Sequence, residues 1–333
     1  MDGTVSQTEN PALLDLVAGE RDEVDAVGPR VGGVARAAPA AVEEPGLRSG
    51  HEDRDEAVSL TSVALQRPFA FLRQSIMGTS TTTPAVRYLD TASAYDLWSA
   101  VYDTDNNFLQ ALDTREMQSL LPKLFSALAD STLPPPWKLV DLGCGTGRNT
   151  MHLLSIPDVD EIVALDLSPK MLDVARQRIS SGESTKVTLQ VYDLMASSNP
   201  TPPPRDSADA IISTLVLEHV PLNAYFAAAK GMLKPRGLLL LTNMHPAMGQ
   251  ISQAGFLDPV TGEKIKAGRS YAHTVGEVVE EARAWGFEVA VGFEERAVTE
   301  ENWAGFGDRA RKWVGVDVWF GGVLRLRGER EDE

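Results

Sequence analysis

The stretch that decides the fold runs from Trp137 to Thr150 and reads WKLVDLGCGTGRNT. Its segment Leu139 to Leu142 is apolar apart from one acid, which is typical of a buried strand. Glycines at alternate positions follow, and they let the backbone pass close to a ligand with no Cβ in the way. A helix is expected from about Arg148. A strand, a glycine-rich turn and a helix in succession indicate a ligand-binding turn at the edge of a sheet.

From Trp137 onward, short apolar runs alternate with amphipathic segments. The runs are KLVDLG, EIVALDLS, KVTLQVYDL, ADAIISTLVLE, GLLLLTNMH, GFEVAVGFEE and VDVWFGGVLRLR. This alternation predicts an α/β fold with a largely parallel sheet. The last two runs have no clear helix between them, so we expect them to form an antiparallel pair. Helices should begin at Ser168-Pro169 and at Thr274, which has Glu277 three residues later, and one should end at Gly286.

Composition divides the chain into three parts. Residues 1–60 hold 13 acidic and 5 basic residues, a net charge of −8, and they contain no Phe, Trp or Tyr. We therefore expect residues 1–84 to be largely disordered, with a short helical piece over 57–71. Aromatic residues become frequent only after this region. We expect residues 85–136 to be helical and residues 137–333 to form the α/β core.

The charge balance limits the partners. With 31 Lys and Arg against 47 Asp and Glu, the formal charge is −16. Such a chain repels phosphate backbones and anionic lipid, so we expect a small-molecule acceptor and neither nucleic acid nor membrane as a partner. The single cysteine, Cys144, cannot form an internal disulfide, and no cluster suggests a metal site. Without a signal-like N-terminus, a cytoplasmic location is expected. The oligomeric state is left open.

The glycine turn belongs to neither of the common phosphate-binding motifs. Arg148 occupies the place of the third glycine of a dinucleotide fingerprint, and no Gly-Lys-Ser/Thr follows. Asp141, two residues before Gly143, would repel a phosphate and suits a cationic ligand. The next strand ends in Asp166, which can accept hydrogen bonds from both ribose hydroxyls, and the third ends in Asp193, which can accept from an adenine amine. These acids predict a site for an unphosphorylated, positively charged nucleoside.

The ordered motifs resemble those of the class I S-adenosylmethionine-dependent methyltransferases. VDLGCGTGRNT is similar to their glycine loop, ALDLS to their ribose-binding acid and VYDL to their adenine-pocket acid. DAIISTLVLEHV and MLKPRGLLLLTN resemble their fourth-strand and fifth-strand motifs. The likeness extends from Trp137 to Arg327. It implies a Rossmann-like sheet of seven strands, mostly parallel with the last strand antiparallel, helices on both faces, and S-adenosyl-L-methionine as the cofactor.

The same resemblance implies that the helical region 85–136 is a lid, since YDLWSAVYDTDNN is similar to the lid helices of small-molecule members. It also implies a set of cofactor-binding residues. They are Asp141, Gly143, Gly145 and Gly147 for the methionine moiety, Asp166 and Leu167 for the ribose, Asp193 and Leu194 for the adenine, Leu215 near the sulfonium, and Tyr95 or Tyr102 as a tyrosine that closes over the cofactor. Tyr95, Trp98 and Tyr102 also have the spacing of a single helix face, so core packing is an alternative role for them.

A closer likeness is to fungal secondary-metabolite methyltransferases, among them the amide N-methyltransferase of gliotoxin-type pathways. It rests on YDLWSAVYDTDNNFLQALD, NMHPAMGQISQAGFLDP, YAHT and KWVGVDVWFGG. The likeness implies methyl transfer to a small natural product in secondary metabolism, with nitrogen favoured over oxygen. The alternative is a catalytically silent protein of the same fold that regulates secondary metabolism through a protein partner.

Removal of a proton from the acceptor would be helped by a base. The candidates are His219, Glu218, His245 and His273. His219 follows the fourth strand and His245 the fifth, so both should lie at the carboxyl edge of the sheet, where the acceptor is expected. For each histidine taken alone, a structural role is the alternative. We predict His219, His245 and Glu218 as the catalytic residues.

Overall fold

The structure, a computed structural model, describes residues 86–180, 185–201, 203 and 205–328. The region predicted to be disordered, 1–84, and the helical piece predicted over 57–71 lie outside the described residues. Within the described ranges, no helix combines the length and the apolarity needed to cross a lipid bilayer.

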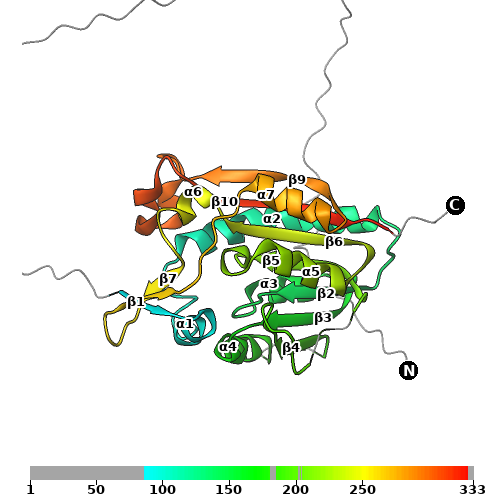
Figure 1. The fold of residues 1–333 in the computed structure, drawn as a ribbon, viewed down its shortest axis with the longest axis horizontal. Helices are drawn as coiled ribbons and strands as arrows, with labels where there is room; N and C mark the ends of the chain where they lie inside the picture. Colours follow the sequence, from blue (N-terminus) through cyan, green and yellow to red (C-terminus); the bar gives the residue numbers. More distant parts are fainter. Residues whose placement is uncertain (1–85, 181–184, 202, 204, 329–333) are drawn as a thin grey trace, which may run out of the picture. The chain divides into compact units, whose positions relative to one another are not determined.

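A sheet of seven strands forms the centre of the described fold, in the order β4-β3-β2-β5-β6-β10-β9 (Figure 1). The strands are β2 (Trp137–Leu142), β3 (Val159–Asp166), β4 (Val187–Val191), β5 (Ala208–Thr214), β6 (Leu233–Met244), β9 (Phe287–Ala297) and β10 (Asp317–Leu326). From β4 to β6, neighbouring strands run parallel, whereas β10 runs antiparallel to both β6 and β9. The predicted α/β fold with a largely parallel sheet is thus confirmed, and the last two strands pair as expected.

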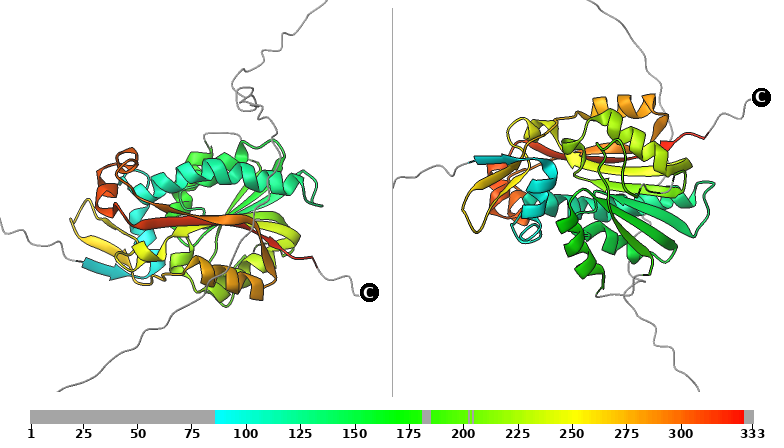
Figure 2. Two further views of the ribbon diagram at one scale, coloured as in Figure 1. Left: turned by 90° about the horizontal axis from the view of Figure 1, so that it is seen from above. Right: turned by 60° about the horizontal axis from the view of Figure 1, so that its bottom comes forward.

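Helices cover both faces of this sheet. They are α2 (Phe108–Ala129), α3 (Arg148–Leu154), α4 (Pro169–Ser180), α5 (Leu222–Met232) and α7 (Val275–Ala284). Buried apolar residues of α2 and α3 pack on one face, together with the short helices η3 (Trp303–Phe306) and η4 (Asp308–Trp313). Those of α5 and α7 pack on the other face. Figure 2 shows α2 and α7 on opposite sides of the strands. The apolar side chains at every third or fourth position of these helices explain the arrangement.

The predicted helix boundaries agree with the structure. At α4 the Oγ of Ser168 accepts a hydrogen bond from the Met171 amide at 3.0 Å. At α7 Thr274 and Glu277 form a reciprocal capping box. Gly286, two residues beyond α7, has a φ of +92°, a conformation that glycine adopts without a steric penalty.

A second, smaller sheet was not predicted. In it β1 (Val86–Leu89) pairs parallel with β8 (Lys264–Ala267), and β8 pairs antiparallel with β7 (Gly255–Leu257). Together with α1 (Thr91–Trp98), these strands form what we call the cap, residues 86–98 and 255–267. The rings of Trp98 and Phe256 stack at 5.3 Å and join its two halves.

The cap differs from the helical lid predicted over residues 85–136. That region begins with a strand, and its long helix α2 packs on the sheet as part of the core. Half of the cap comes instead from the segment after β6. The physical reason is that β1 forms its hydrogen bonds with β8, which lies far along the chain. A local sequence pattern does not indicate such a long-range pairing.

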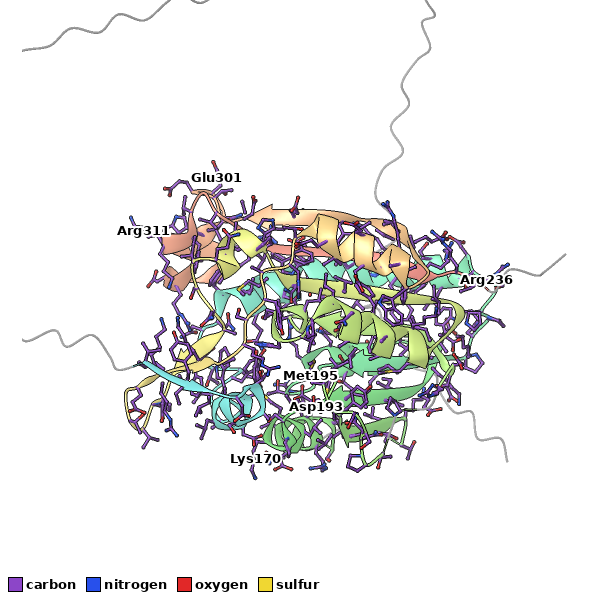
Figure 3. All side chains as sticks on the ribbon, viewed as in Figure 1. Lys170, Asp193, Met195, Arg236, Glu301 and Arg311 are labelled. Carbon is purple, nitrogen blue, oxygen red and sulfur yellow. The ribbon has the colours of Figure 1, made fainter. Side chains whose placement is uncertain are left out.

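The cap lies at the carboxyl ends of the parallel strands (Figure 1). Asp193 and Met195, which follow β4, lie toward this end of the sheet, whereas Arg236, near the start of β6, lies at the opposite end (Figure 3). The turns that leave the parallel strands therefore face the cap, as expected for a ligand site in an open α/β sheet.

Candidate functional site

The turn after β2 takes its shape from glycines in the left-handed region. Gly143, Gly145 and Gly147 have φ values of +78°, +54° and +79°. A Cβ on Gly143 would lie 2.2 Å from the Cγ2 of Val216, so no larger residue fits there. A Cβ on Gly145 would meet no atom within 4 Å, because Gly145 faces open space. The turn thus presents bare backbone to a cavity.

Asp166, the last residue of β3, holds this turn in place. Its Oδ2 accepts a hydrogen bond from the Gly145 amide and its Oδ1 accepts one from the Ser168 amide, both at 2.8 Å. Burial raises the pKa of Asp166 to about 6, and the backbone hydrogen bonds oppose this shift only in part. A carboxylate in this position gains from further donors such as a pair of hydroxyl groups.

Asp141 has a different role from the one expected. It is 1% exposed and does not line the cavity; its Oδ2 accepts a hydrogen bond from the Thr150 Oγ1 at 2.6 Å. Burial raises the pKa of Asp141 to about 6. The side chain therefore supports the turn from beneath, by tying β2 to α3, and does not meet a ligand directly. Gly147 likewise lies off the cavity, as the N-cap of α3.

Asp193 lies beyond the end of β4, in a short loop that its own hydrogen bonds order. Its Oδ1 accepts from the Met195 amide at 2.7 Å, and its amide donates to the Asn199 Oδ1 at 2.8 Å. Leu194 and Met195 line the cavity beside it. This corner combines an acceptor with apolar surface, which suits a flat heterocycle.

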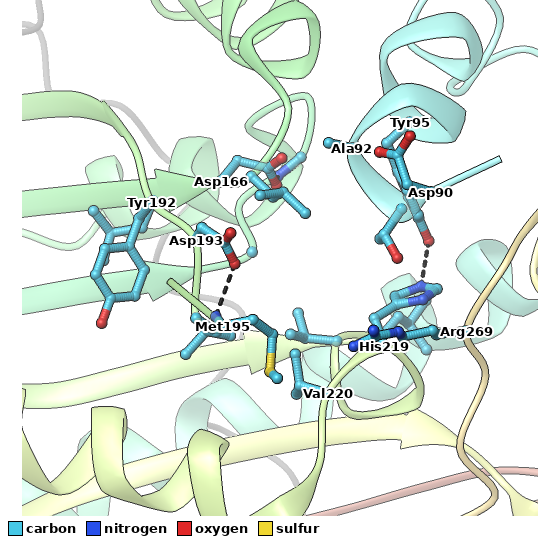
Figure 4. Close-up of a pocket in the computed structure, with 18 of the residues that line it drawn as sticks. Asp90, Ala92, Tyr95, Asp166, Tyr192, Asp193, Met195, His219, Val220 and Arg269 are labelled. Carbon is cyan, nitrogen blue, oxygen red and sulfur yellow. Dashed lines mark hydrogen bonds between the residues drawn. The ribbon is translucent and has the colours of Figure 1, made fainter. Parts of the chain in front are cut away.

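These turns and the cap enclose a cavity of about 550 Å³ (Figure 4). The predicted site residues on its wall are Tyr95, Tyr102, Gly143, Gly145, Asp166, Leu167, Asp193, Leu194, Leu215 and His219. Leu215 has a φ of +58°, a strained conformation for a residue with a Cβ, of the kind that structures retain at functional sites. The volume is in the range of small-molecule and cofactor sites.

His219 and Tyr95 meet at the cap side of the cavity. The Tyr95 hydroxyl lies 2.7 Å from the His219 Nε2, and Figure 4 shows the pair bridging α1 and the short helix η2 (Leu217–His219). Burial lowers the pKa of His219 to about 4 and raises the pKa of Tyr95 well above its usual value. Near neutral pH, the ring and the hydroxyl are thus both uncharged.

Glu218 adjoins this pair without reaching the cavity. Its Oε1 lies 3.9 Å from the His219 Nε2, and the residue is 3% exposed. Burial raises the pKa of Glu218 to about 7. The carboxyl group therefore exchanges its proton near neutrality beside the histidine, although it is not positioned to touch a ligand.

Two of the histidine candidates lie elsewhere. The Nδ1 of His245 accepts a hydrogen bond from the Ala247 amide at 3.1 Å, as the N-cap of α6 (Pro246–Gly249), and its Nε2 lies 2.9 Å from the Glu295 Oε1. The Nε2 of His273 lies 3.0 Å from the Val220 carbonyl oxygen. Neither residue lines the cavity, so their placement gives no support to the predicted role as a base.

Several cavity residues were missed by sequence reasoning. Half of them come from the cap and from the segment after β8: Tyr88, Leu89, Asp90, Thr91, Ala92, Gly268 and Arg269. The other half adjoin the predicted residues at the strand ends: Leu142, Leu165, Tyr192, Met195, Thr214, Val216 and Val220. Asp90 carries a recognisable local signal, since its Oδ1 accepts from the Ser93 amide as the N-cap of α1. No local pattern marks Arg269, which reaches the site through the pairing of β1 with β8.

The part of the chain that carries the glycine turn, Asp166 and Asp193 is similar to known proteins. A family model described as a methyltransferase domain matches residues 139–237. An uncharacterized methyltransferase of Emericella nidulans is 46% identical over 260 residues, which cover 71% of this chain and 91% of that protein. A trans-aconitate 2-methyltransferase of Methylobacterium nodulans is 38% identical over 97 residues, 29% of this chain and 34% of that protein.

Solved structures were compared as well. The structure of an S-adenosylmethionine-dependent methyltransferase from Mesorhizobium loti has 23% sequence identity and a TM-score of 0.44. It covers 61% of this chain and 97% of that chain.

Proposed function

This chain belongs to the methyltransferase family, with S-adenosyl-L-methionine as its cofactor, and we propose that it transfers a methyl group to a nitrogen or oxygen atom of a small molecule. The observation that carries the proposal is the Asp166 carboxylate, which accepts the Gly145 amide and lines the same cavity as Asp193. A close-approach turn and two strand-end acids in one cavity suit a cationic nucleoside.

The residues present fit this cofactor. Open space beside Gly145 leaves room for a ligand against the backbone, and the buried Asp166 carboxyl gains from hydroxyl donors. In this arrangement Asp166 and Leu167 would hold the ribose, and Asp193 and Leu194 the adenine. The cofactor supplies a methyl group that is already activated for transfer. The protein therefore has to align the acceptor and exclude water, tasks that can contribute about 7–11 kcal/mol in favourable cases.

The Tyr95–His219 pair is the part of the cavity suited to handling a proton. Because the pKa of His219 is about 4, its ring is neutral near pH 7 and can accept a hydrogen bond. In our proposal the Tyr95 hydroxyl accepts the proton that the acceptor releases while it passes its own proton to the Nε2 of His219, 2.7 Å away. An ionised Glu218, 3.9 Å from that nitrogen, then favours the protonated ring through its charge.

The acceptor class follows from charge and size. A cavity of about 550 Å³ has the size of a small-molecule site, and the net charge of −16 disfavours nucleic acid and anionic membrane surfaces. The likeness of the cap and loop segments to fungal secondary-metabolite methyltransferases supports a natural product as the acceptor, with nitrogen as the preferred atom.

The test is titration calorimetry with S-adenosylmethionine and S-adenosylhomocysteine. We expect Asp166→Ala to abolish binding of both. Asp160→Ala, which removes an exposed acid near the start of the same strand, should bind like the wild type. Unchanged affinity in Asp166→Ala would refute the cofactor site.

Turnover is tested by mass spectrometry of a small-molecule panel for products that carry one additional methyl group. We expect His219→Ala to lower the rate about 100-fold while donor affinity changes little. His245→Ala should keep the rate, since His245 lies off the cavity. Tight donor binding without any methylated product would favour the silent regulator.

A further inference from the structure

Arg269 is the only lysine or arginine that lines the cavity within the described part of the chain. It follows β8 and the cap, and Figure 4 shows it beside His219, across the cavity from Asp166 and Asp193. Arg269 therefore lies on a different wall of the cavity from Asp166 and Asp193, the acids proposed to hold the nucleoside. Arg269 is an exposed residue, so an anionic group that enters the cavity can reach its guanidinium.

The cavity's own acids do not supply such an anionic group. Each of them already accepts hydrogen bonds from backbone amides. Asp90 accepts one from Ser93, Asp166 accepts one each from Gly145 and Ser168, and Asp193 accepts one from Met195. Over the residues that the structure describes, no carboxylate forms an ion pair with Arg269. Its guanidinium carries five N–H donors in a planar fork, which matches a carboxylate in two-point contact.

The backbone that carries Arg269 is fixed from both sides. The Gly268 amide donates to the Leu89 carbonyl oxygen at 2.6 Å, and the Tyr271 amide donates to the Glu218 carbonyl oxygen at 2.8 Å. The first bond ties the segment to the cap and the second ties it to η2. Arg269 therefore extends from a point set by the two elements that also hold Tyr95 and His219.

A cation in the cavity favours an anionic acceptor in spite of the negative net charge of the chain. A protein with a net charge of −16 repels anions at long range, and three more acids line this cavity. A cationic or neutral acceptor would need no arginine at this position. A local guanidinium offsets the repulsion at short range and fixes the orientation of the bound anion.

We infer that Arg269 binds a carboxylate, or a group of like charge, on the methyl acceptor, and that it selects anionic small molecules as substrates. The inference rests on the proposed function, because it places the acceptor beside a bound methyl donor. The donor also carries a carboxylate, on its methionine part, so the experiment has to separate these two sources.

The first arm tests the donor. S-adenosylhomocysteine, which carries the amino-acid carboxylate, and 5′-deoxy-5′-methylthioadenosine, which lacks it, are titrated into the wild type, Arg269→Gln and Arg87→Gln. Arg87 is an arginine of β1 that does not line the cavity, so it is the matched control. For each ligand, we expect the same affinity in the wild type and in both variants. Weaker binding of S-adenosylhomocysteine alone to Arg269→Gln would assign Arg269 to the donor and overturn the inference.

The second arm tests the acceptor. A small-molecule extract of Emericella nidulans, whose methyltransferase is 46% identical, is separated on an anion exchanger into retained and unretained fractions. Each fraction is incubated with methyl-labelled donor at limiting extract. We expect labelled product from the retained fraction, a rate about 10-fold or more lower for Arg269→Gln, and partial recovery in Arg269→Lys. Arg87→Gln should match the wild type.

The outcomes separate the two hypotheses. Label from the unretained fraction alone, or an unchanged rate for Arg269→Gln on the retained fraction, would overturn the inference and leave the proposed function intact. No labelled product from any fraction with the wild type would refute the proposed function, and this inference with it.

Discussion

Burial sets the ionisation of the side chains around the cavity. It raises the pKa of Asp141 and Asp166 to about 6 and that of Glu218 to about 7, and it lowers the pKa of His219 to about 4. All four shifts favour the uncharged form, as desolvation requires. The site therefore holds acidic groups that stability alone would not select, which is common where groups are placed for chemistry.

Glu218→Gln should stabilise the protein at high pH. The folded-state pKa of Glu218, about 7, lies above the ordinary value of 4.5, so the folded state keeps a proton that the unfolded chain releases. Its contribution is favourable below about pH 4.5 and is lost as pH rises through 7. We expect the variant to equal the wild type near pH 4.5 and to exceed it by roughly 1–3 kcal/mol at pH 8.

Chemical denaturation as a function of pH measures this difference. Glu280→Gln, a change at an exposed carboxylate of α7, is the matched control and should parallel the wild type throughout. A Glu218→Gln curve with the same pH dependence as the wild type would contradict the buried, protonated glutamate.

At the scale of the element, the sequence was a good guide wherever a local signal exists. The seven apolar runs correspond to β2, β3, β4, β5, β6, β9 and β10. They could be predicted because the apolar pattern of a strand and the turn residues that bound it are both local signals in the sequence. Gly143, Gly145 and Asp166 fall on the cavity wall for the same reason. Asp141 and His245 do not, since a strand-end position leaves open whether a side chain faces the ligand or the layer beneath.

Gly145→Ala should impair donor binding more than folding. Gly145 has a φ of +54° with open space beside it, so the added methyl costs about 1–2 kcal/mol of stability through its conformation alone. It also enters the volume that the donor needs, and we expect affinity for S-adenosylhomocysteine to fall about 10-fold or more. Calorimetry and thermal unfolding measure the two effects.

Gly262→Ala is the matched control for the glycine turn. Gly262 has a φ of +71° and equally open surroundings, but it lies in the loop between β7 and β8, off the cavity. It should lose similar stability and keep full donor affinity. Equal loss of affinity in both variants would show that Gly145 does not face the donor.

At the scale of the whole molecule, the cap was beyond reach of the sequence. Its halves, residues 86–98 and 255–267, meet through the β1–β8 register and the Trp98–Phe256 stack. Both contacts join segments that are separated in the chain by α2 and by β2 to β6, so no window of sequence contains them. This is also why Arg269 was not predicted as a cavity residue, although it lines the wall.

Phe256→Ala should weaken the cap and the site together. Phe256 is 3% exposed, and its loss leaves Trp98 without its stacking partner, at a cost of about 3–5 kcal/mol. Because Trp98 packs against Tyr95 at 5.4 Å, the Tyr95–His219 contact should loosen, and donor affinity should fall.

Denaturation and donor titration measure both effects. Leu257→Ala, at the neighbouring residue, which is 59% exposed, should alter neither. A Phe256→Ala protein with full donor affinity would show that the cap plays no part in holding the ligand.

The parallel pairing of β1 with β8 also orders events during synthesis. β1 leaves the ribosome long before its partner and remains an unpaired edge while β2 to β6 emerge. The turns on the sheet side of the cavity can therefore form first, whereas the cap is complete only after residues 264–267 have been synthesised. In a nascent chain, the sheet side of the cofactor site can thus be present before the cap that covers it.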